Sequence, residues 1–235
     1  MQKSTVNEIR DRFDKDVDRF SNLDTGQTST IDAKLSLELI TEAAARLKPD
    51  AKYLLDIGCG AGNYTVTMLH KINNLDCTLI DLSKPMLDKA FERVSAETGN
   101  HVEIIQGDIR EIELKENHFD IILAGAVLHH LRDDRDWETT FNKLFRILKP
   151  GGCLMICDLI TQDTEVLNDF IWEKYGDYLE SVGGAAYRQK VLDYVAREDS
   201  PRSLNYQLDL MKKTGFRQTE ILHKNICFAA FGGIK

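Results

Sequence analysis

Before residue 52, apolar positions recur every three or four residues along the chain. The first such series consists of Ile9, Phe13, Val17 and Phe20. A second series runs over residues 35–44, after Asp32 as a candidate N-cap and before Pro49. This spacing predicts two amphipathic helices. The polar residues 21–30 between them are expected to form a loop.

From residue 52 onward, short apolar runs alternate with helical patterns. The runs predict strands at residues 53–57, 77–80, 102–106, 119–123 and 153–157. The helical patterns cover residues 63–71, 85–97 and 137–148. Ser83 is the expected cap of the second of these helices. Because the strands are apolar on both faces, they predict a parallel sheet covered by helices on both sides, an α/β fold.

The alternation stops at residue 161. Helical patterns surround Gly183-Gly184, and five aromatic residues there are candidates for a substrate pocket or for core packing: Trp172, Tyr175, Tyr178, Tyr187 and Tyr194. A helix is then predicted to end at Gly215, and two strands flank Asn225 as a hairpin. We therefore divide the chain into an N-terminal helical cap (1–50), a ligand-binding core (51–160), a helical lid insert (161–205), and a last helix with a C-terminal strand hairpin that completes the sheet (206–235).

Composition narrows the class of protein. The formal net charge of the 235 residues is −8, which argues against nucleic acid or a membrane surface as a partner. No apolar run reaches the ~18 residues that cross a bilayer, and the first residues lack an apolar signal core, so a cytoplasmic location is expected. The five cysteines include no Cys-x-x-Cys pair, so neither a disulfide framework nor a metal site is expected. Cys153 and Cys157 are expected to share one face of a buried strand.

The glycine-rich segment at residues 56–62 follows a predicted strand and precedes a helix. Glycines there allow a sharp turn and a close approach of backbone to ligand, and the helix amides that follow can receive an anionic group. A dinucleotide loop has the spacing Gly-x-Gly-x-x-Gly, whereas Gly58, Gly60 and Gly62 are more closely spaced. This disfavours a dehydrogenase. A tight turn without a ligand is the structural alternative.

Carboxylates follow the next two strands. Asp81 lies 19 residues after Gly62, near the ~20 expected for an acid that binds ribose hydroxyls. Asp108 ends the third strand beside Ile109, where a carboxylate can accept from an adenine amino group while the ring packs on the isoleucine. Taken singly, Asp81 is also explained as a surface cap and Asp108 as part of a turn. In this order they predict a nucleoside site.

The order of the glycine loop, the two acids, the strand at 119–122 and the Leu-Lys-Pro-Gly-Gly run at 148–152 resembles that of the Rossmann-like class I S-adenosylmethionine-dependent methyltransferases. The resemblance covers about residues 51–158. It implies a seven-stranded, mostly parallel sheet with an antiparallel last strand, and S-adenosylmethionine as cofactor, with S-adenosylhomocysteine as product.

The resemblance also implies individual roles along the cofactor. The glycine loop and Asp56 would surround the methionine portion, Asp81 would hold the ribose, and Asp108 would meet the adenine. The full predicted set of cofactor-binding residues is Asp56, Gly58, Cys59, Gly60, Gly62, Asp81, Leu82, Met86, Asp108, Ile109, Ala124 and Gly125.

The expected chemistry is an in-line displacement of a methyl group from a positive sulfur, in which alignment supplies much of the rate. An acidic acceptor such as a hydroxyl or thiol also needs a base. His130, in the pair that follows the fourth strand, is the candidate catalytic base. A structural role is the alternative, because Leu-His-His-Leu-like sequences recur across this superfamily with differing substrates.

A small-molecule methyl acceptor is the leading expectation. The alternatives are an RNA- or protein-modifying methyltransferase and a non-catalytic cofactor-binding module, although the glycine loop and the ribose acid are both intact. Residues 199–216 and the closing hairpin also faintly resemble the carboxy-S-adenosylmethionine synthases of tRNA wobble modification. Those enzymes place an arginine where Leu210 stands in this chain, and that departure favours the ordinary cofactor.

Overall fold

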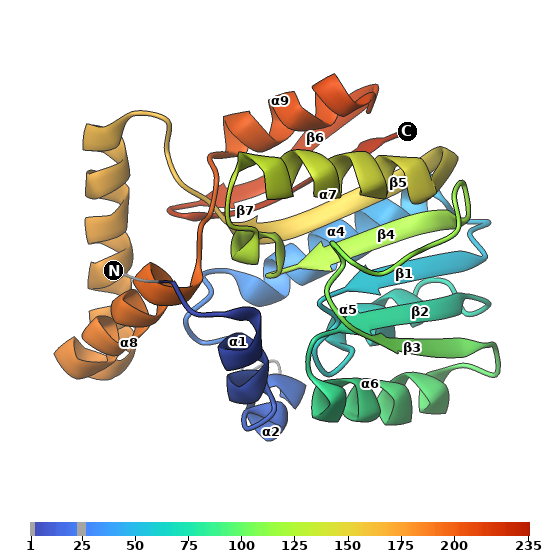
Figure 1. Ribbon diagram of the computed structural model, residues 1–235, viewed down its shortest axis with the longest axis horizontal. Helices are drawn as coiled ribbons and strands as arrows, with labels where there is room; N and C mark the ends of the chain where they lie inside the picture. Colours follow the sequence, from blue (N-terminus) through green and yellow to red (C-terminus); the bar gives the residue numbers. More distant parts are fainter. Residues whose placement is uncertain (1–2, 23–26) are drawn as a thin grey trace.

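The computed structural model describes residues 3–22 and 27–235, and a seven-stranded sheet forms its centre (Figure 1). The strand order is β3-β2-β1-β4-β5-β7-β6, and β7 runs opposite in direction to the other six strands. This confirms the expected fold class. The strands are β1 (Tyr53–Ile57), β2 (Asp76–Asp81), β3 (Val102–Gln106), β4 (Phe119–Gly125), β5 (Leu148–Leu159), β6 (Gln218–Asn225) and β7 (Phe228–Ile234).

Helices cover both faces of the sheet. One face carries α4 (Ala33–Leu47), α5 (Asn63–Leu69) and α6 (Lys84–Glu97), and the other carries α7 (Asp134–Ile147) and α9 (Leu204–Thr214). Each interface buries one continuous apolar cluster. Strand order reverses between β1 and β4, and in such sheets ligands bind outside the carboxyl ends of the strands at this point.

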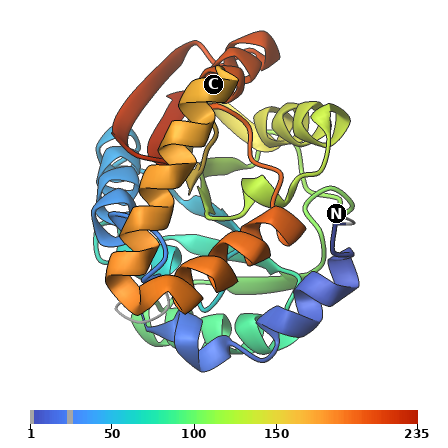
Figure 2. The ribbon, with the colours of Figure 1, turned by 90° about the vertical axis from the view of Figure 1, so that its left-hand side faces the viewer.

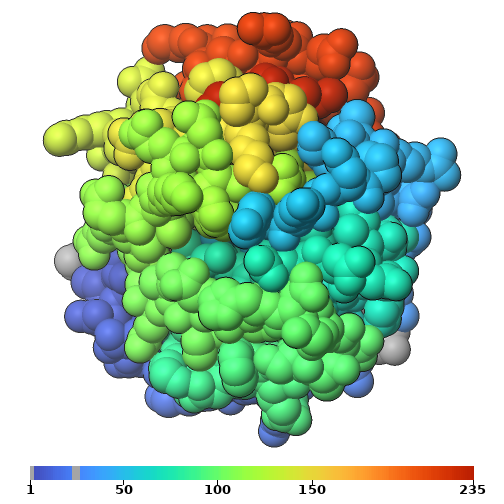
Figure 3. All heavy atoms as spheres, turned by 90° about the vertical axis from the view of Figure 1, so that its right-hand side faces the viewer, coloured from blue at the N-terminus to red at the C-terminus, as the bar shows by residue number. Residues whose placement is uncertain are grey.

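The remaining helices lie beyond the carboxyl ends of the parallel strands (Figures 1 and 2). They are α1 (Val6–Phe13), α2 (Val17–Ser21), the 3-10 helix η1 (Leu128–His130) and α8 (Glu165–Glu198). Gly184 has non-helical angles (φ 78°, ψ 176°), so α8 consists of two arms joined by a kink. An ion pair of 2.8 Å between Arg12 and Glu198 ties α1 to the second arm. Figure 3 shows the opposite end of the molecule with all heavy atoms drawn.

Local sequence signals fix several helix ends. The Ser83 hydroxyl accepts a hydrogen bond from the Met86 amide, as expected for a cap, and α9 ends at Gly215. Cys153 and Cys157 pack in one apolar cluster, which confirms that they share a face. No helix in the described part of the chain is long and apolar enough to cross a membrane.

Two expectations for the N-terminal region were wrong in detail. The apolar series beginning at Ile9 does not form one helix, because the amides of Lys15 and Asp16 bond to carbonyls three residues earlier and tighten the chain into a break between α1 and α2. Asp32 precedes α4 with φ 55° but makes no capping bond; its carboxylate accepts instead from Asn225 on β6. Of the expected loop at 21–30, residues 23–26 lie outside the described residues.

Candidate active site

The glycine loop turns the chain from β1 into α5 at the switch point of the sheet. Gly58, Gly60 and Gly62 all have left-handed φ values, of 63°, 52° and 81°. At Gly58 space is also limiting, because a Cβ there would lie 2.4 Å from Cγ2 of Val127. Only glycine allows both the left-handed φ value and the close contact with Val127 at this position. Without a Cβ, the loop backbone is open to a ligand.

Asp81 closes the far side of this loop. Its two carboxylate oxygens accept hydrogen bonds from the backbone amides of Gly60 (2.9 Å) and Ser83 (2.8 Å). Burial raises the pKa of the Asp81 carboxyl group. Each oxygen keeps a lone pair, so the carboxylate can still accept from a ligand hydroxyl.

Asp56, at the end of β1, lies beneath the loop. It is buried and accepts a hydrogen bond of 2.7 Å from the Thr65 hydroxyl on α5, while its other oxygen has no partner. Burial raises the pKa of Asp56 to about 7. Its side chain therefore supports the start of α5 and does not reach the cavity described next.

A cavity of about 120 Å³ lies over the glycine loop. Seven predicted cofactor-binding residues line it: Gly58, Cys59, Gly60, Asp81, Leu82, Met86 and Gly125. The other five do not: Asp56, Gly62, Asp108, Ile109 and Ala124. The structure thus brings the glycine loop, Asp81 and the end of β4 to one place.

Asp108 and Ile109, the residues predicted to contact adenine, do not line this cavity. Burial disfavours the charge of Asp108, but Arg110 donates to both of its oxygens and holds the pKa of that carboxyl below its ordinary value. Arg110 also bonds to Asp136. Ile109 is buried in the core cluster under α7. The contacts of Asp108 and Ile109 with adenine stay a prediction.

Sequence reasoning missed the residues that cover the small cavity. Phe13, Phe20 and Gln27 reach over it from the N-terminal region, and Tyr64 forms part of its wall. Gly125 accommodates the tyrosine ring, because a Cβ at Gly125 would lie 2.4 Å from Tyr64 Cε2. The apolar spacing that revealed Phe13 and Phe20 indicated only a helix face, with nothing to show what that face would cover.

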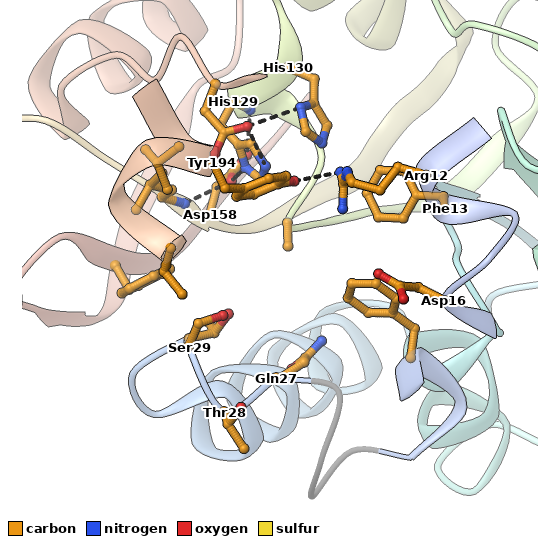
Figure 4. A pocket seen from close by; sticks show the side chains of 18 of the residues that line it. Arg12, Phe13, Asp16, Gln27, Thr28, Ser29, His129, His130, Asp158 and Tyr194 are labelled. Carbon is orange, nitrogen blue, oxygen red and sulfur yellow. Dashed lines mark hydrogen bonds and ion pairs between the residues drawn. The ribbon is translucent and has the colours of Figure 1, made fainter. Parts of the chain in front are cut away.

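A second cavity of about 700 Å³ adjoins the first and extends under α8 (Figure 4). Tyr175, Tyr187 and Tyr194 line it, whereas Trp172 and Tyr178 pack beside the apolar cluster at the base of α8. Five residues line both cavities: Phe13, Phe20, Gln27, Ala126 and His130. The arrangement is therefore a small chamber at the glycine loop that leads into a larger chamber under the helices.

Two histidines and two aspartates gather in the wall of the larger chamber (Figure 4). His129 Nδ1 bonds to the carboxylate of Asp158, at the end of β5. Asp199, which follows α8, places one oxygen 3.2 Å from His130 Nδ1 and 3.8 Å from His129 Nε2. The residues come from η1, β5 and the end of α8, so only the folded chain assembles them.

Burial and the carboxylates act in opposite directions on these histidines. Burial alone would lower the pKa of His129, but Asp158 and Asp199 raise it to about 9. Burial and the neighbouring His129 lower the pKa of His130. Burial opposes the charge of Asp199, yet the two imidazoles hold the pKa of its carboxyl below the usual value. The charge state of each of these groups therefore depends on its neighbours in the cluster.

Comparisons with known proteins identify a methyltransferase domain in the chain. Residues 54–152 match the family described as "Methyltransferase domain". A carboxy-S-adenosyl-L-methionine synthase of Vibrio atlanticus is 26% identical over 196 residues, which cover 80% of this chain and 78% of that protein. A demethylmenaquinone methyltransferase of Lactococcus lactis is 25% identical over 172 residues, 71% of this chain and 66% of that protein.

Solved structures share the fold. An O-methyltransferase family protein from Burkholderia thailandensis superposes with a TM-score of 0.64 at 16% identity, over 97% of this chain and 60% of that chain. Human N-acetylserotonin methyltransferase, solved with S-adenosylmethionine, gives a TM-score of 0.62 at 13% identity, over 98% and 57%. The chain thus spans about 60% of the length of these two structures.

The sheet order, the loop at its switch point and the matched domain support a class I, Rossmann-like S-adenosylmethionine-dependent methyltransferase. The same findings support an enzyme that transfers methyl groups, with S-adenosylmethionine as its cofactor.

Proposed function

We propose that this enzyme transfers a methyl group from S-adenosylmethionine to a small molecule held in the larger chamber. The observation that carries the proposal is the junction of the two chambers at Ala126 and His130, directly beyond the glycine loop. The bound cofactor supplies a methyl group on a positive sulfur. The chain supplies alignment of an acceptor with that methyl group, which is the main requirement of an in-line displacement.

The residues around the small chamber fit this cofactor. Asp81 offers free lone pairs at the position expected for ribose hydroxyls, and Gly58 and Gly60 leave the backbone open to the methionine portion. Gly125 lies on the opposite wall, where the sulfonium is expected. We propose that these residues, with Cys59, form the core of the cofactor site.

The shape of the larger chamber supports a small acceptor. Aromatic side chains from α1, α2 and α8 surround it, and a volume of about 700 Å³ falls in the range usual for small-ligand sites. A loop of RNA or protein would need a more open approach. The negative net charge adds to the argument against RNA.

The resemblance to carboxy-S-adenosylmethionine synthases marks a second candidate function. It rests on relatives 23–26% identical to this chain. Among the described residues that line the small chamber there is no arginine or lysine to hold an extra carboxylate. Leu210 is buried in the core cluster of the opposite sheet face. These contacts favour the ordinary cofactor.

Thermal denaturation with and without S-adenosylhomocysteine tests cofactor binding. At 100 times its dissociation constant, a ligand specific for the folded state adds about 2.7 kcal/mol, so Tm should rise by several degrees. The Asp81→Ala variant should lose most of this shift, while Asp88→Ala, an exposed acid on α6, should keep it. An unchanged Tm with saturating ligand would contradict the proposal.

Transfer of isotope-labelled methyl from the cofactor to a panel of phenols, thiols and amines then identifies the acceptor class.

His130 is the predicted catalytic residue, and it lines both chambers. We expect His130→Ala to lower kcat at least about tenfold, because the side chain stands at the acceptor side of the junction. The dissociation constant of S-adenosylhomocysteine should stay within about twofold of wild type. Titration calorimetry and single-turnover kinetics measure the two quantities separately. A kcat equal to wild type would contradict a catalytic role.

A further inference from the structure

The cluster of His129, His130 and Asp199 has a geometry that ion pairing alone does not explain. Nδ1 of His130 and Oδ1 of Asp199 are 3.2 Å apart, yet each is buried without a hydrogen-bond partner of acceptable geometry. Nε2 of His129 lies 3.8 Å from the same oxygen, beyond hydrogen-bond distance. Three ligand atoms therefore converge without satisfying one another.

We propose that His129 Nε2, His130 Nδ1 and Asp199 Oδ1 form a binding site for a divalent transition-metal ion of the Zn²⁺ type. One ligand atom from each of the three residues lies within 4.8 Å of the others, and the two ring nitrogens lie 3.8 Å and 3.2 Å from Asp199 Oδ1. Ligand atoms that share an ion at about 2.1 Å are separated by about 3.0–3.4 Å, so only small side-chain shifts are needed. Two imidazoles and one carboxylate are a common ligand set for catalytic zinc, which keeps one coordination position open.

Asp158 supports this assignment from behind. Its carboxylate bonds to Nδ1 of His129 and also accepts from the backbone amide of His129, so it fixes the ring with Nε2 turned toward Asp199. Histidines that bind metal usually donate their second ring nitrogen to such a carboxylate. In the metal-free protein, the raised pKa of His129 gives its ring a positive charge that offsets one of the two carboxylates. Metal binding would displace that proton, and the divalent ion would then offset both Asp158 and Asp199.

The site also has access to solvent and to the acceptor. His129, His130, Asp158 and Asp199 all line the larger chamber, which joins the small one at His130 (Figure 4). The ion's open position would therefore face the acceptor. The expectation of no metal site rested on the cysteine pattern alone, whereas this cluster consists of histidines and an aspartate.

If the proposed function holds, the ion deepens it for acceptors that carry a hydroxyl. A hydroxyl bound to a divalent ion loses its proton to solvent more readily. In the transfer, an oxygen lone pair forms the bond to the methyl carbon, and the carbon–sulfur bond breaks with its electron pair left on sulfur. The ion keeps its oxidation state. His130 would then act by holding the ion.

Titration calorimetry of tag-free, chelator-treated full-length protein with Zn²⁺ alone tests the site. We expect one ion per chain in wild type, and a characteristic visible absorption when Co²⁺ replaces Zn²⁺. Asp199→Asn and His130→Gln should weaken binding more than about 100-fold, and Asp158→Asn about 10–100-fold. His118→Gln is the matched control, since that histidine stacks on Tyr53, apart from the cluster, and it should bind like wild type.

Each variant is also melted with S-adenosylhomocysteine, so that a folding defect is distinguished from loss of a ligand. Absence of stoichiometric Zn²⁺ binding to wild type would overturn the proposal, as would binding that persists in Asp199→Asn and His130→Gln. If the cofactor product binds and Zn²⁺ does not, the metal site fails and the methyltransferase proposal stands. If Zn²⁺ binds at the cluster and the cofactor product does not bind, the metal site stands and the methyltransferase proposal fails.

Discussion

At the scale of single residues, the glycine loop separates backbone strain from steric contact. Gly58 and Gly60 both have left-handed φ values, but a Cβ at Gly58 would meet Val127 at 2.4 Å, whereas a Cβ at Gly60 meets nothing within 4 Å. The two positions therefore form a matched pair for mutation.

We expect Gly60→Ala to cost about 1 kcal/mol of unfolding free energy through strain alone. Gly58→Ala should cost about 1–3 kcal/mol more, since the contact with Val127 forces the backbone or that side chain to move. Urea denaturation of both variants measures the difference. Equal losses would show that Val127 yields freely.

Asp56 gives the stability of the molecule a specific pH dependence. Its pKa is raised from 3.8 to about 7 in the folded chain, so the fold favours the protonated form. The contribution of Asp56 is fully present below pH 4 and is lost as pH rises through 7. Asp56→Asn should retain the bond from Thr65 and remove this loss.

The difference in unfolding free energy between pH 5 and pH 8 is the quantity to compare. We expect the decrease over this interval to be smaller in Asp56→Asn than in wild type by a few kcal/mol at most. Other titrating groups are common to both proteins and cancel in the comparison. Identical pH profiles would show that Asp56 titrates normally.

The residues that the sequence could predict are those whose neighbours are local. Asp81 follows its strand and reaches the loop at Gly60 through one hydrogen bond, so spacing alone placed it at the cavity. Phe13 covers the same cavity because Arg12 beside it pairs with Glu198, 186 positions away. Asp199 likewise meets His130 only after α8 folds back. No local pattern encodes contacts of this range.

At the scale of elements, α1 and α2 are short and lightly anchored. Ile9 is the only buried residue in α1, and α2 has none. The cavity beneath them, at about 120 Å³, is smaller than the 300–1,000 Å³ usual for ligand sites. We therefore expect Phe13 and Phe20 to move outward to admit the cofactor and then to rest on it.

Hydrogen exchange tests this expectation. Amides of α1 and α2 should exchange rapidly without ligand, because helices with few buried contacts open readily. Saturating S-adenosylhomocysteine should slow their exchange severalfold, whereas α4, which is packed on the sheet, provides the unchanged reference. Equal exchange of α1 with and without ligand would contradict the covering role.

The elements of the core were more predictable than those that cover it. The strands from β1 to β5 were anticipated because short apolar runs between helices leave a buried sheet as the consistent solution. The edge strand β3 is only partly buried, and β5 begins at Leu148, where the end of a helix was expected. The break between α1 and α2 was not predictable, because the apolar series continues across it. Phe13 and Phe20 both line the small chamber, although they belong to separate helices. Periodicity records which residues are covered and carries no information about straightness.

At the scale of the whole molecule, the two chambers share a wall, which includes Phe13 and Phe20. The small chamber lies between the glycine loop and the N-terminal helices, and the larger one extends from those helices to α8; we propose that the cofactor binds in the first and the acceptor in the second. Whatever occupies the larger chamber therefore presses on Phe13 and Phe20 from one side, while the cofactor needs them displaced from the other.

We expect this shared wall to set the order in which the cofactor and the acceptor bind. An acceptor already in place would hold Phe13 and Phe20 over the small chamber, so the cofactor must enter first and its spent form must leave last. Initial-rate kinetics should show a compulsory sequence, with high acceptor concentrations slowing turnover by trapping the used cofactor. Random addition of the two substrates would show that the chambers open independently. In kinetic terms, we expect Phe13 and Phe20 to impose an ordered mechanism.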